Sequence, residues 1–203
     1  MQNLEMWLEP LAEELNYSEQ DITGVKNNEI FNDTVRRMGG LDILIISSGI
    51  GFENDEFEWN LEKQTINVNV IGFSEIVNIG YNYFQKQTFG HIVGISSIAA
   101  IRGIGSCPAY SASKAYISNY LEALRKKAKN QIVKIQVTEI IPGFVDTEMA
   151  KGKGLFWVAP IEKAASQILQ AIDNKATVAY ITKRWRLIAF LLKFIPRTIY
   201  DRI

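Results

Sequence analysis

Tyr110 and Lys114 have the residue types and the spacing of an acid–base pair. They stand four positions apart, so on a helix they share one face. A free phenol has a pKa of about 10 and protonates a carbonyl slowly near neutral pH, but a nearby ammonium favours the phenolate and lowers that pKa. A tyrosine tuned in this way exchanges a proton with a ketone or an alcohol. The pair therefore predicts acid–base chemistry at a carbonyl or hydroxyl oxygen.

Ser97 completes this pattern upstream. It stands thirteen positions before Tyr110 and ends an apolar stretch, 92–95, that is typical of a buried strand. A hydroxyl at that point hydrogen-bonds a substrate oxygen and holds it against the phenol. Taken singly, Tyr110 also fits a half-buried aromatic and Lys114 a solvated helix charge. The order of strand, Ser-Ser, Gly-containing loop and YSASK favours a site.

The segment Gly94–Lys114, GISSIAAIRGIGSCPAYSASK, resembles the active-site segment of the short-chain dehydrogenase/reductase family. Matches to that family run in its own order from about residue 10 to 182. The resemblance implies hydride transfer between NAD or NADP and a small-molecule carbonyl/alcohol substrate. Within it, residues 69–72 (NVIG) resemble the helix whose asparagine supports a proton-relay water. The catalytic residues implied are Asn69, Ser97, Tyr110 and Lys114.

Further matches imply contacts with the cofactor. Residues 21–23 (DIT) resemble the acidic turn beside the adenine, and 142–147 (PGFVDT) resemble the loop at the nicotinamide and its carboxamide. Residues 41–49 (LDILIISSG) resemble the strand that ends in Asn-Asn-Ala-Gly. At this position Ser47 offers one hydroxyl in place of the asparagine amide, or it is part of a simple turn at the strand end. Gly49 still lets a ring or ribose come close to the backbone. The cofactor-binding residues implied are Asp21, Ile22, Ser47, Gly49, Asn69, Tyr110, Lys114, Pro142, Gly143, Val145 and Thr147.

The family's glycine-rich phosphate turn, TGxxxGxG, has no counterpart in this sequence. Met38-Gly39-Gly40 lies between a helix and a strand, so it reads as a helix stop. The amphipathic stretch 4–15 resembles the helix that follows the second strand of the family. We therefore expect an N-terminally truncated member, and the choice between NAD and NADP stays open. The alternative is a catalytically inactive remnant that lacks the pyrophosphate cradle and acts as an interaction module.

The expected fold is α/β: a Rossmann-like doubly wound parallel sheet in three layers, missing the first βαβ part. It forms one incomplete domain, 1–182, followed by a tail, 183–203. Without the central first strand, residues 43–46 are expected at an open sheet edge. Long helices are predicted over 66–84 and 162–173. The predicted strands are 41–47, 91–96, 132–140 and 176–181.

Composition excludes several other classes of protein. The 203 residues carry 22 basic and 22 acidic side chains, so no global basic field points to nucleic acid. The single cysteine, Cys107, excludes an internal disulfide and fits a reducing cytoplasm. Neither it nor the single histidine, His91, has the spacing of metal ligands, and no metal is expected. The first residues do not resemble a signal peptide.

Two apolar regions lie downstream of the motifs. Residues 149–160 (MAKGKGLFWVAP) occupy the variable substrate-loop position of the family, either as a lid over an apolar substrate or as a loop packed on the core. The tail 183–203 (KRWRLIAFLLKFIPRTIYDRI) surrounds an apolar run with basic residues. It is too short and too charged to span a bilayer. It predicts a helix that docks on the domain, forms a homo-oligomer contact or lies peripherally in a membrane interface.

Overall fold

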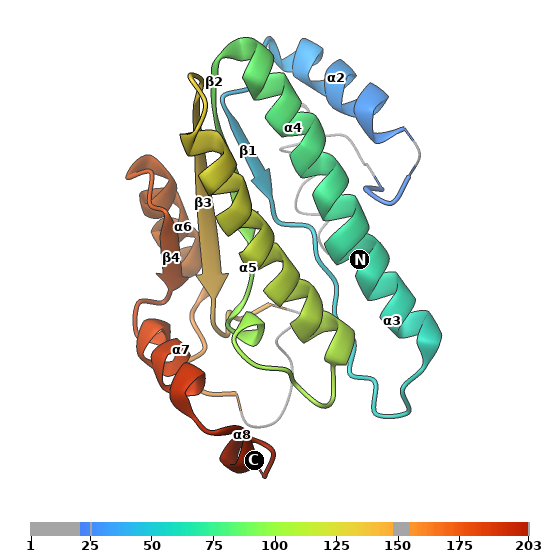
Figure 1. The fold of residues 1–203 in the computed structure, drawn as a ribbon, viewed down its shortest axis with the longest axis vertical. Coiled ribbons are helices and arrows are strands. Elements are labelled where there is room, and N and C mark those ends of the chain that lie inside the picture. Colours follow the sequence, from blue (N-terminus) through green and yellow to red (C-terminus); the bar gives the residue numbers. More distant parts are fainter. Residues whose placement is uncertain (1–20, 25, 148–154, 203) are drawn as a thin grey trace.

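The computed structural model describes residues 21–24, 26–147 and 155–202. The helix predicted over 4–15 lies outside the described residues. Within them, thirteen helices and strands form an α/β domain, and the core consists of one sheet with helices on both of its faces (Figure 1).

Four parallel strands form the sheet, in the spatial order β1-β2-β3-β4. Every predicted strand is present, with its bounds within two residues of the prediction, because each is a short apolar run between polar breaks. Parallel neighbours place all four carboxyl ends at one edge of the sheet, which is where ligands bind in open α/β sheets. The strands are β1 (Ile43–Ile46), β2 (Phe89–Ile95), β3 (Lys134–Pro142) and β4 (Val178–Ile181).

Helices cover both faces of this sheet. On one face lie α2 (Asn27–Met38), α4 (Phe73–Gln87) and α5 (Pro108–Lys129), and on the other lies α6 (Ile161–Asp173) (Figure 1). Two apolar clusters correspond to these faces, which confirms the three layers. The α5 face buries Phe73, Val77, Phe84, Ile92, Ile117, Leu121 and Val137, and the α6 face buries Val93, Ile140, Ala164, Ala171, Ile172 and Ile181.

The helix predicted over 66–84 is part of a longer one. It begins as α3 (Trp59–Ile66), continues through a π-helical turn, η1 (Asn67–Gly72), and ends as α4. The π turn was not predicted, because apolar periodicity reports only the average period of a helix. Single π turns inside α-helices are frequent at functional sites, and this one carries Asn69.

The predicted open edge is present among the described residues. β1 pairs with β2 alone, and its two faces differ in burial. Ile46 is 4% exposed on the α5 face, whereas Ile43 and Ile45 are 42% and 47% exposed. The edge strand therefore has apolar side chains that the described chain leaves in contact with solvent.

The C-terminal residues form α7 (Trp185–Phe194) and α8 (Arg197–Tyr200). The first of these helices docks on the domain through Trp185 and Ala189, which are 2% and 1% exposed. Its carboxyl end is held by Arg102, which follows the short 3-10 helix η2 (Ile98–Ala100). The Arg102 guanidinium donates to the backbone oxygens of Leu192 and Ile195. No described helix is long and apolar enough to cross a membrane.

Candidate active site

Ser97 and the first two turns of α5 meet at the carboxyl end of β2. Ser97 has extended backbone geometry, and its hydroxyl accepts a hydrogen bond from the Ala99 amide at 3.1 Å, which starts η2. Pro108 occupies the first turn of α5, where a missing amide hydrogen costs nothing. Tyr110 and Lys114 follow one turn apart on the face that packs against the sheet. The predicted Ser-Tyr-Lys group is thus assembled.

Lys114 is a buried ammonium. The residue is 5% exposed, and its Nζ donates to the backbone oxygen of Ile95 at 3.1 Å. Burial lowers the pKa of Lys114 to about 8, because desolvation penalises the charged form. Its Nζ also lies 5.7 Å from the centroid of the Tyr110 ring. No carboxylate among the described side chains forms an ion pair with it.

The phenol of Tyr110 is held mainly in its protonated form. Burial raises the pKa of Tyr110, a hydrogen bond with the Ser97 side chain opposes that rise, and Cys107 adds to it. The lowering expected from Lys114 is therefore not the direction found in this structure, because desolvation of the phenol outweighs it. The Ser97 side chain therefore lies beside the phenol, and the roles of both residues toward a substrate stay predictions.

Asn69 is fully buried, and its side-chain amide is held by three hydrogen bonds. It is 0% exposed, and its Oδ1 accepts from the backbone amide of Ile50 at 2.9 Å. Its Nδ2 donates to the backbone oxygen of the same residue at 2.7 Å and to Ser113 Oγ at 2.9 Å. Ser113 in turn donates to the backbone oxygen of Tyr110 at 2.7 Å. The asparagine thus ties the loop after β1 to the first turns of α5.

Two glycines line the Tyr110–Lys114 face. A Cβ atom on residue 49 would lie 3.0 Å from the Lys114 Nζ, and one on residue 51 would lie 2.5 Å from the Tyr110 ring. Gly49 was predicted as a close backbone approach, but Gly51 was not. The pattern Gly-x-Gly at this strand end was the available signal for it.

The loop 142–147 leaves the end of the neighbouring strand. Gly143 donates its amide to the Ile181 oxygen at 2.7 Å, and the Thr147 amide donates to the Val145 oxygen at 2.7 Å. Val145 also forms an isolated parallel β-bridge with Ala159. The loop is therefore fixed by β4 and by the described part of the predicted lid. It stands at the same sheet edge as Ser97, since the Ser96 amide donates to the Ile140 oxygen at 2.9 Å.

The predicted adenine-side residues lie at the margin of this centre. Asp21 is exposed and its Oδ1 accepts from the amide and hydroxyl of Thr23 at 2.8 and 2.7 Å, which lowers the Asp21 pKa. Ile22 packs against Gly72, in the π turn that carries Asn69. Ser47 is exposed directly after β1. Their cofactor roles stay predictions.

A buried carboxylate behind Ser97 was missed by the sequence analysis. Glu139 on β3 is 3% exposed and accepts from Ser96 Oγ at 2.8 Å. Arg125 on α5 lies 3.9 Å from its other oxygen. Strand periodicity identifies Glu139 as inward-facing, but its contact with Ser96, 43 positions away in the sequence, appears only in the folded structure.

The surroundings of Cys107 and His91 favour a structural role for both side chains over a catalytic one. Burial raises the pKa of the Cys107 thiol, which disfavours a nucleophilic thiolate. His91 Nε2 lies 2.8 Å from the Thr138 hydroxyl, and burial lowers the pKa of His91.

Sequence comparison agrees with this geometry. The sequence model of the short chain dehydrogenases matches residues 2–155, so the chain belongs to that family. It is 30% identical over 156 residues to an uncharacterized oxidoreductase of Staphylococcus epidermidis, covering 73% of this chain and 66% of the relative. It is also 30% identical over 122 residues to mouse (Mus musculus) 15-hydroxyprostaglandin dehydrogenase [NAD(+)], covering 59% and 43%. The matched part of the chain thus spans from about two fifths to two thirds of the length of these relatives.

Solved structures show the same fold. A short chain dehydrogenase from Burkholderia cenocepacia in complex with NADP superposes with a TM-score of 0.75 at 23% identity, covering 91% of this chain and 76% of that one. The bulky-bulky ketone specific alcohol dehydrogenase from Comamonas testosteroni gives 0.72 at 18% identity, covering 96% and 81%. These similarities establish a Rossmann-like fold for the chain.

Proposed function

We propose that this chain is an NAD- or NADP-dependent oxidoreductase that interconverts an apolar ketone and its alcohol. The observation that carries the proposal is the Ser97–Tyr110–Lys114 group at the carboxyl ends of the strands, with half-buried hydroxyl groups beside a buried ammonium. A hydroxyl beside a phenol, with an ammonium near the phenol ring, forms an acid–base group. Proton exchange with a substrate oxygen is the chemistry that they support.

The residues fit the nicotinamide–ribose end of such a cofactor. A Cβ atom at Gly49 would lie 3.0 Å from the Lys114 Nζ, so a side chain at that position would push the ammonium aside. An ammonium with three donors and the Ile95 oxygen as its acceptor favours hydroxyl oxygens as further partners. A bound NADH or NADPH would supply the hydride. The B. cenocepacia neighbour was solved with NADP, and the mouse relative is named for NAD(+).

The protein's own groups would supply the proton. In the direction of reduction, the carbonyl oxygen accepts hydrogen bonds from Ser97 and Tyr110. As the hydride reaches the carbonyl carbon, the phenol O–H gives its proton to the developing alkoxide, and the alcohol and a phenolate result. The raised pKa of Tyr110 keeps the phenol protonated and ready for this step. The Lys114 ammonium then stabilises the phenolate until solvent returns the proton.

Asn69 and Gly51 act by positioning. Both hydrogens of the Asn69 amide are used in contacts with Ile50 and Ser113, so support of a relay water rests on its remaining oxygen lone pair. These hydrogen bonds fix the backbone of residues 49–51 against the reacting pair. Any side chain at Gly51 would displace the Tyr110 ring.

An apolar substrate is supported by the aromatic side chains beside the loop 142–147. The rings of Phe144 and Phe156 lie 5.9 Å apart, and Phe156 and Trp157 are 48% and 41% exposed. Exposed aromatic rings near a reaction centre favour apolar ligands over sugars or acids. The C. testosteroni neighbour, described as specific for bulky ketones, agrees with this class.

A binding titration tests the proposal. NADH and NADPH are titrated calorimetrically into the chain and into Lys114→Met, with Lys126→Met as a matched control on the exposed side of the same helix. Saturable binding that weakens in Lys114→Met alone supports the proposal. Apolar ketones are then screened for turnover. Lack of saturation at millimolar cofactor contradicts the proposal and favours the inactive remnant.

A further inference from the structure

The helix α7 is apolar on two opposite faces. One face carries Trp185 and Ala189 and is buried against the domain. The other face carries residues at positions i, i+3, i+4 and i+7, which form a continuous stripe on a helix. No described element covers that stripe, as the exposures show. Leu187 is 58% exposed, Phe190 59%, Leu191 50% and Phe194 70%.

Basic side chains surround this apolar stripe. In a chain with equal numbers of acidic and basic residues, the described segment 183–202 holds six basic residues against one acidic residue, Asp201. All of the basic residues are exposed. They are Lys183, Arg184, Arg186, Lys193, Arg197 and Arg202.

The patch continues onto the segment that covers the loop 142–147. The Arg184 guanidinium lies 5.0 Å from the centroid of the Trp157 ring and donates to the Trp157 backbone oxygen at 2.7 Å. The rings of Phe156 and Trp185 lie 5.2 Å apart. Exposed Phe156 and Trp157 therefore lie beside the amino-terminal end of α7, next to Trp185 and Arg184. We call these two aromatic residues, the four exposed apolar residues of α7 and the six basic residues the C-terminal patch.

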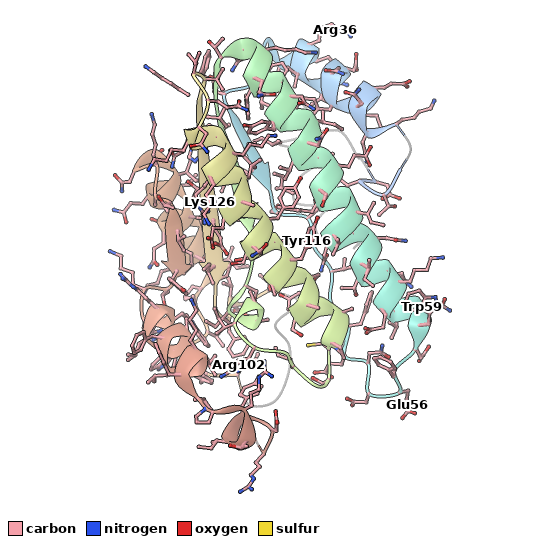
Figure 2. The ribbon with its side chains drawn as sticks, in the orientation of Figure 1. Arg36, Glu56, Trp59, Arg102, Tyr116 and Lys126 are labelled. Atoms are coloured by element: carbon pink, nitrogen blue, oxygen red, sulfur yellow. The ribbon has the colours of Figure 1, made fainter. Side chains whose placement is uncertain are left out.

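The C-terminal patch is fixed to the domain. Arg102 holds the last carbonyl groups of α7, and the Tyr200 hydroxyl donates to the Gly103 oxygen at 2.9 Å. The Arg102 guanidinium also lies 5.4 Å from the centroid of the Tyr200 ring. The patch lies at one end of the molecule, around α7 and α8, with Arg102 beside it (Figures 1 and 2). Its exposed apolar groups are therefore presented on a rigid support.

We propose that the C-terminal patch binds the surface of an anionic lipid bilayer, with the α7 stripe in the headgroup–acyl boundary and the basic residues at the lipid phosphates. Apolar and aromatic residues on one helix face, flanked by Lys and Arg, have the composition of an interfacial helix. A second copy of the chain fits less well. A two-fold contact through α7 would bring two identical basic rims together without acidic partners. This inference is independent of hydride transfer.

Vesicle co-sedimentation of the whole chain tests the proposal. The probes are vesicles of phosphatidylcholine alone and of phosphatidylcholine with phosphatidylserine, each at low and high salt. We expect binding to the anionic vesicles, weakened by salt. Arg186→Gln/Lys193→Gln should lower the partition coefficient roughly thirtyfold, since each juxtamembrane charge contributes about a factor of five. Phe190→Asn/Phe194→Asn should lower it at least as much.

Matched controls lie at the far side of the molecule. Arg36→Gln/Arg37→Gln removes two exposed charges from α2, and Trp59→Asn removes a 66% exposed aromatic residue from α3 (Figure 2). Both controls should bind vesicles as the parent chain does. Equal binding to neutral and anionic vesicles, or equal losses in the controls, would overturn the proposal. So would sedimentation of the lipid-free chain as a dimer that Phe190→Asn/Phe194→Asn converts to a monomer, because a second copy would then cover the stripe. Cofactor binding by the variants tests the proposed function separately.

Discussion

The indole of Trp185 occupies the space where a side chain of residue 143 would have to lie. A Cβ atom on Gly143 would stand 2.0 Å from Cε2 of that ring, far inside any van der Waals contact. Trp185 opens the C-terminal helix, and Gly143 lies in the loop proposed to face the nicotinamide. The helix that carries the C-terminal patch and the loop 142–147 of the candidate active site are therefore packed as one unit.

Gly143→Ala should destabilise the fold. The indole is 2% exposed and would have to shift to make room for the methyl group, so overpacking should cost about 1–3 kcal/mol in the free energy of unfolding. Urea denaturation measures this cost. Gly103→Ala is the control, since a Cβ atom there meets nothing within 4 Å. In Trp185→Leu, the same Gly143→Ala change should cost less than in the parent chain. Equal costs in both backgrounds would refute the steric account.

Asn69→Ala should be among the most damaging polar substitutions. It removes three hydrogen bonds and leaves the partly buried Ile50 backbone groups without these partners, for a loss of about 2–4 kcal/mol. Asn82→Ala, in the same long helix but exposed, should cost less than about 0.5 kcal/mol. Urea midpoints of the two variants compare them. Similar midpoints would show that the Asn69 hydrogen bonds do not stabilise the site.

Lys114 should make stability depend on pH. Its pKa falls from the ordinary 10.5 to about 8 on folding, so the unfolded chain binds more protons between those values and stability rises with pH. The gain from pH 7 to 9.5 should be about 2 kcal/mol. Lys114→Met should lack this gain, whereas Lys126→Met should keep it. Parallel pH profiles for the parent chain and Lys114→Met would contradict a desolvated ammonium.

Arg102 should hold the C-terminal helix in place. Its guanidinium bonds to backbone oxygens at the end of α7, and such charged hydrogen bonds contribute about 1.5–3 kcal/mol. In Arg102→Ala, hydrogen exchange of the α7 amides should accelerate, while exchange in α5 stays slow. Arg36→Ala, at an exposed position, serves as the control. Unchanged protection of α7 would show that Trp185 alone anchors the helix.

The sequence was informative where structure depends on neighbours along the chain. Apolar runs located all four strands, and the Ser97–Tyr110–Lys114 spacing identified three candidate residues that the fold brings together. Interactions between distant segments were not predictable in this way. The contact of Asn69 with Ser113 spans 44 positions, and that of Ser96 with Glu139 spans 43, so neither produces a local pattern. The raised pKa of Tyr110 depends on burial, which only the packed fold determines.

The C-terminal tail, residues 183–203, is a second case in which the sequence alone did not determine the contacts. Its composition suited docking, self-association and membrane contact alike. Only the fold shows that Trp185 and Ala189 face the domain while Phe190 and Phe194 face outward. One amphipathic pattern thus concealed two apolar faces, one buried against the domain and one exposed.

Transfer of deuterium from a C4-deuterated nicotinamide cofactor to an apolar ketone tests the central claim most directly. Incubation with each cofactor is followed by mass analysis of the alcohol, for the parent chain and for Tyr110→Phe. We expect deuterium on the carbinol carbon with the parent chain. We expect a rate at least about a hundredfold lower in Tyr110→Phe, because the proton donor is lost while cofactor binding remains. Label transfer at equal rates in both proteins, or in neither despite bound cofactor, would contradict Tyr110 as the acid of a working oxidoreductase.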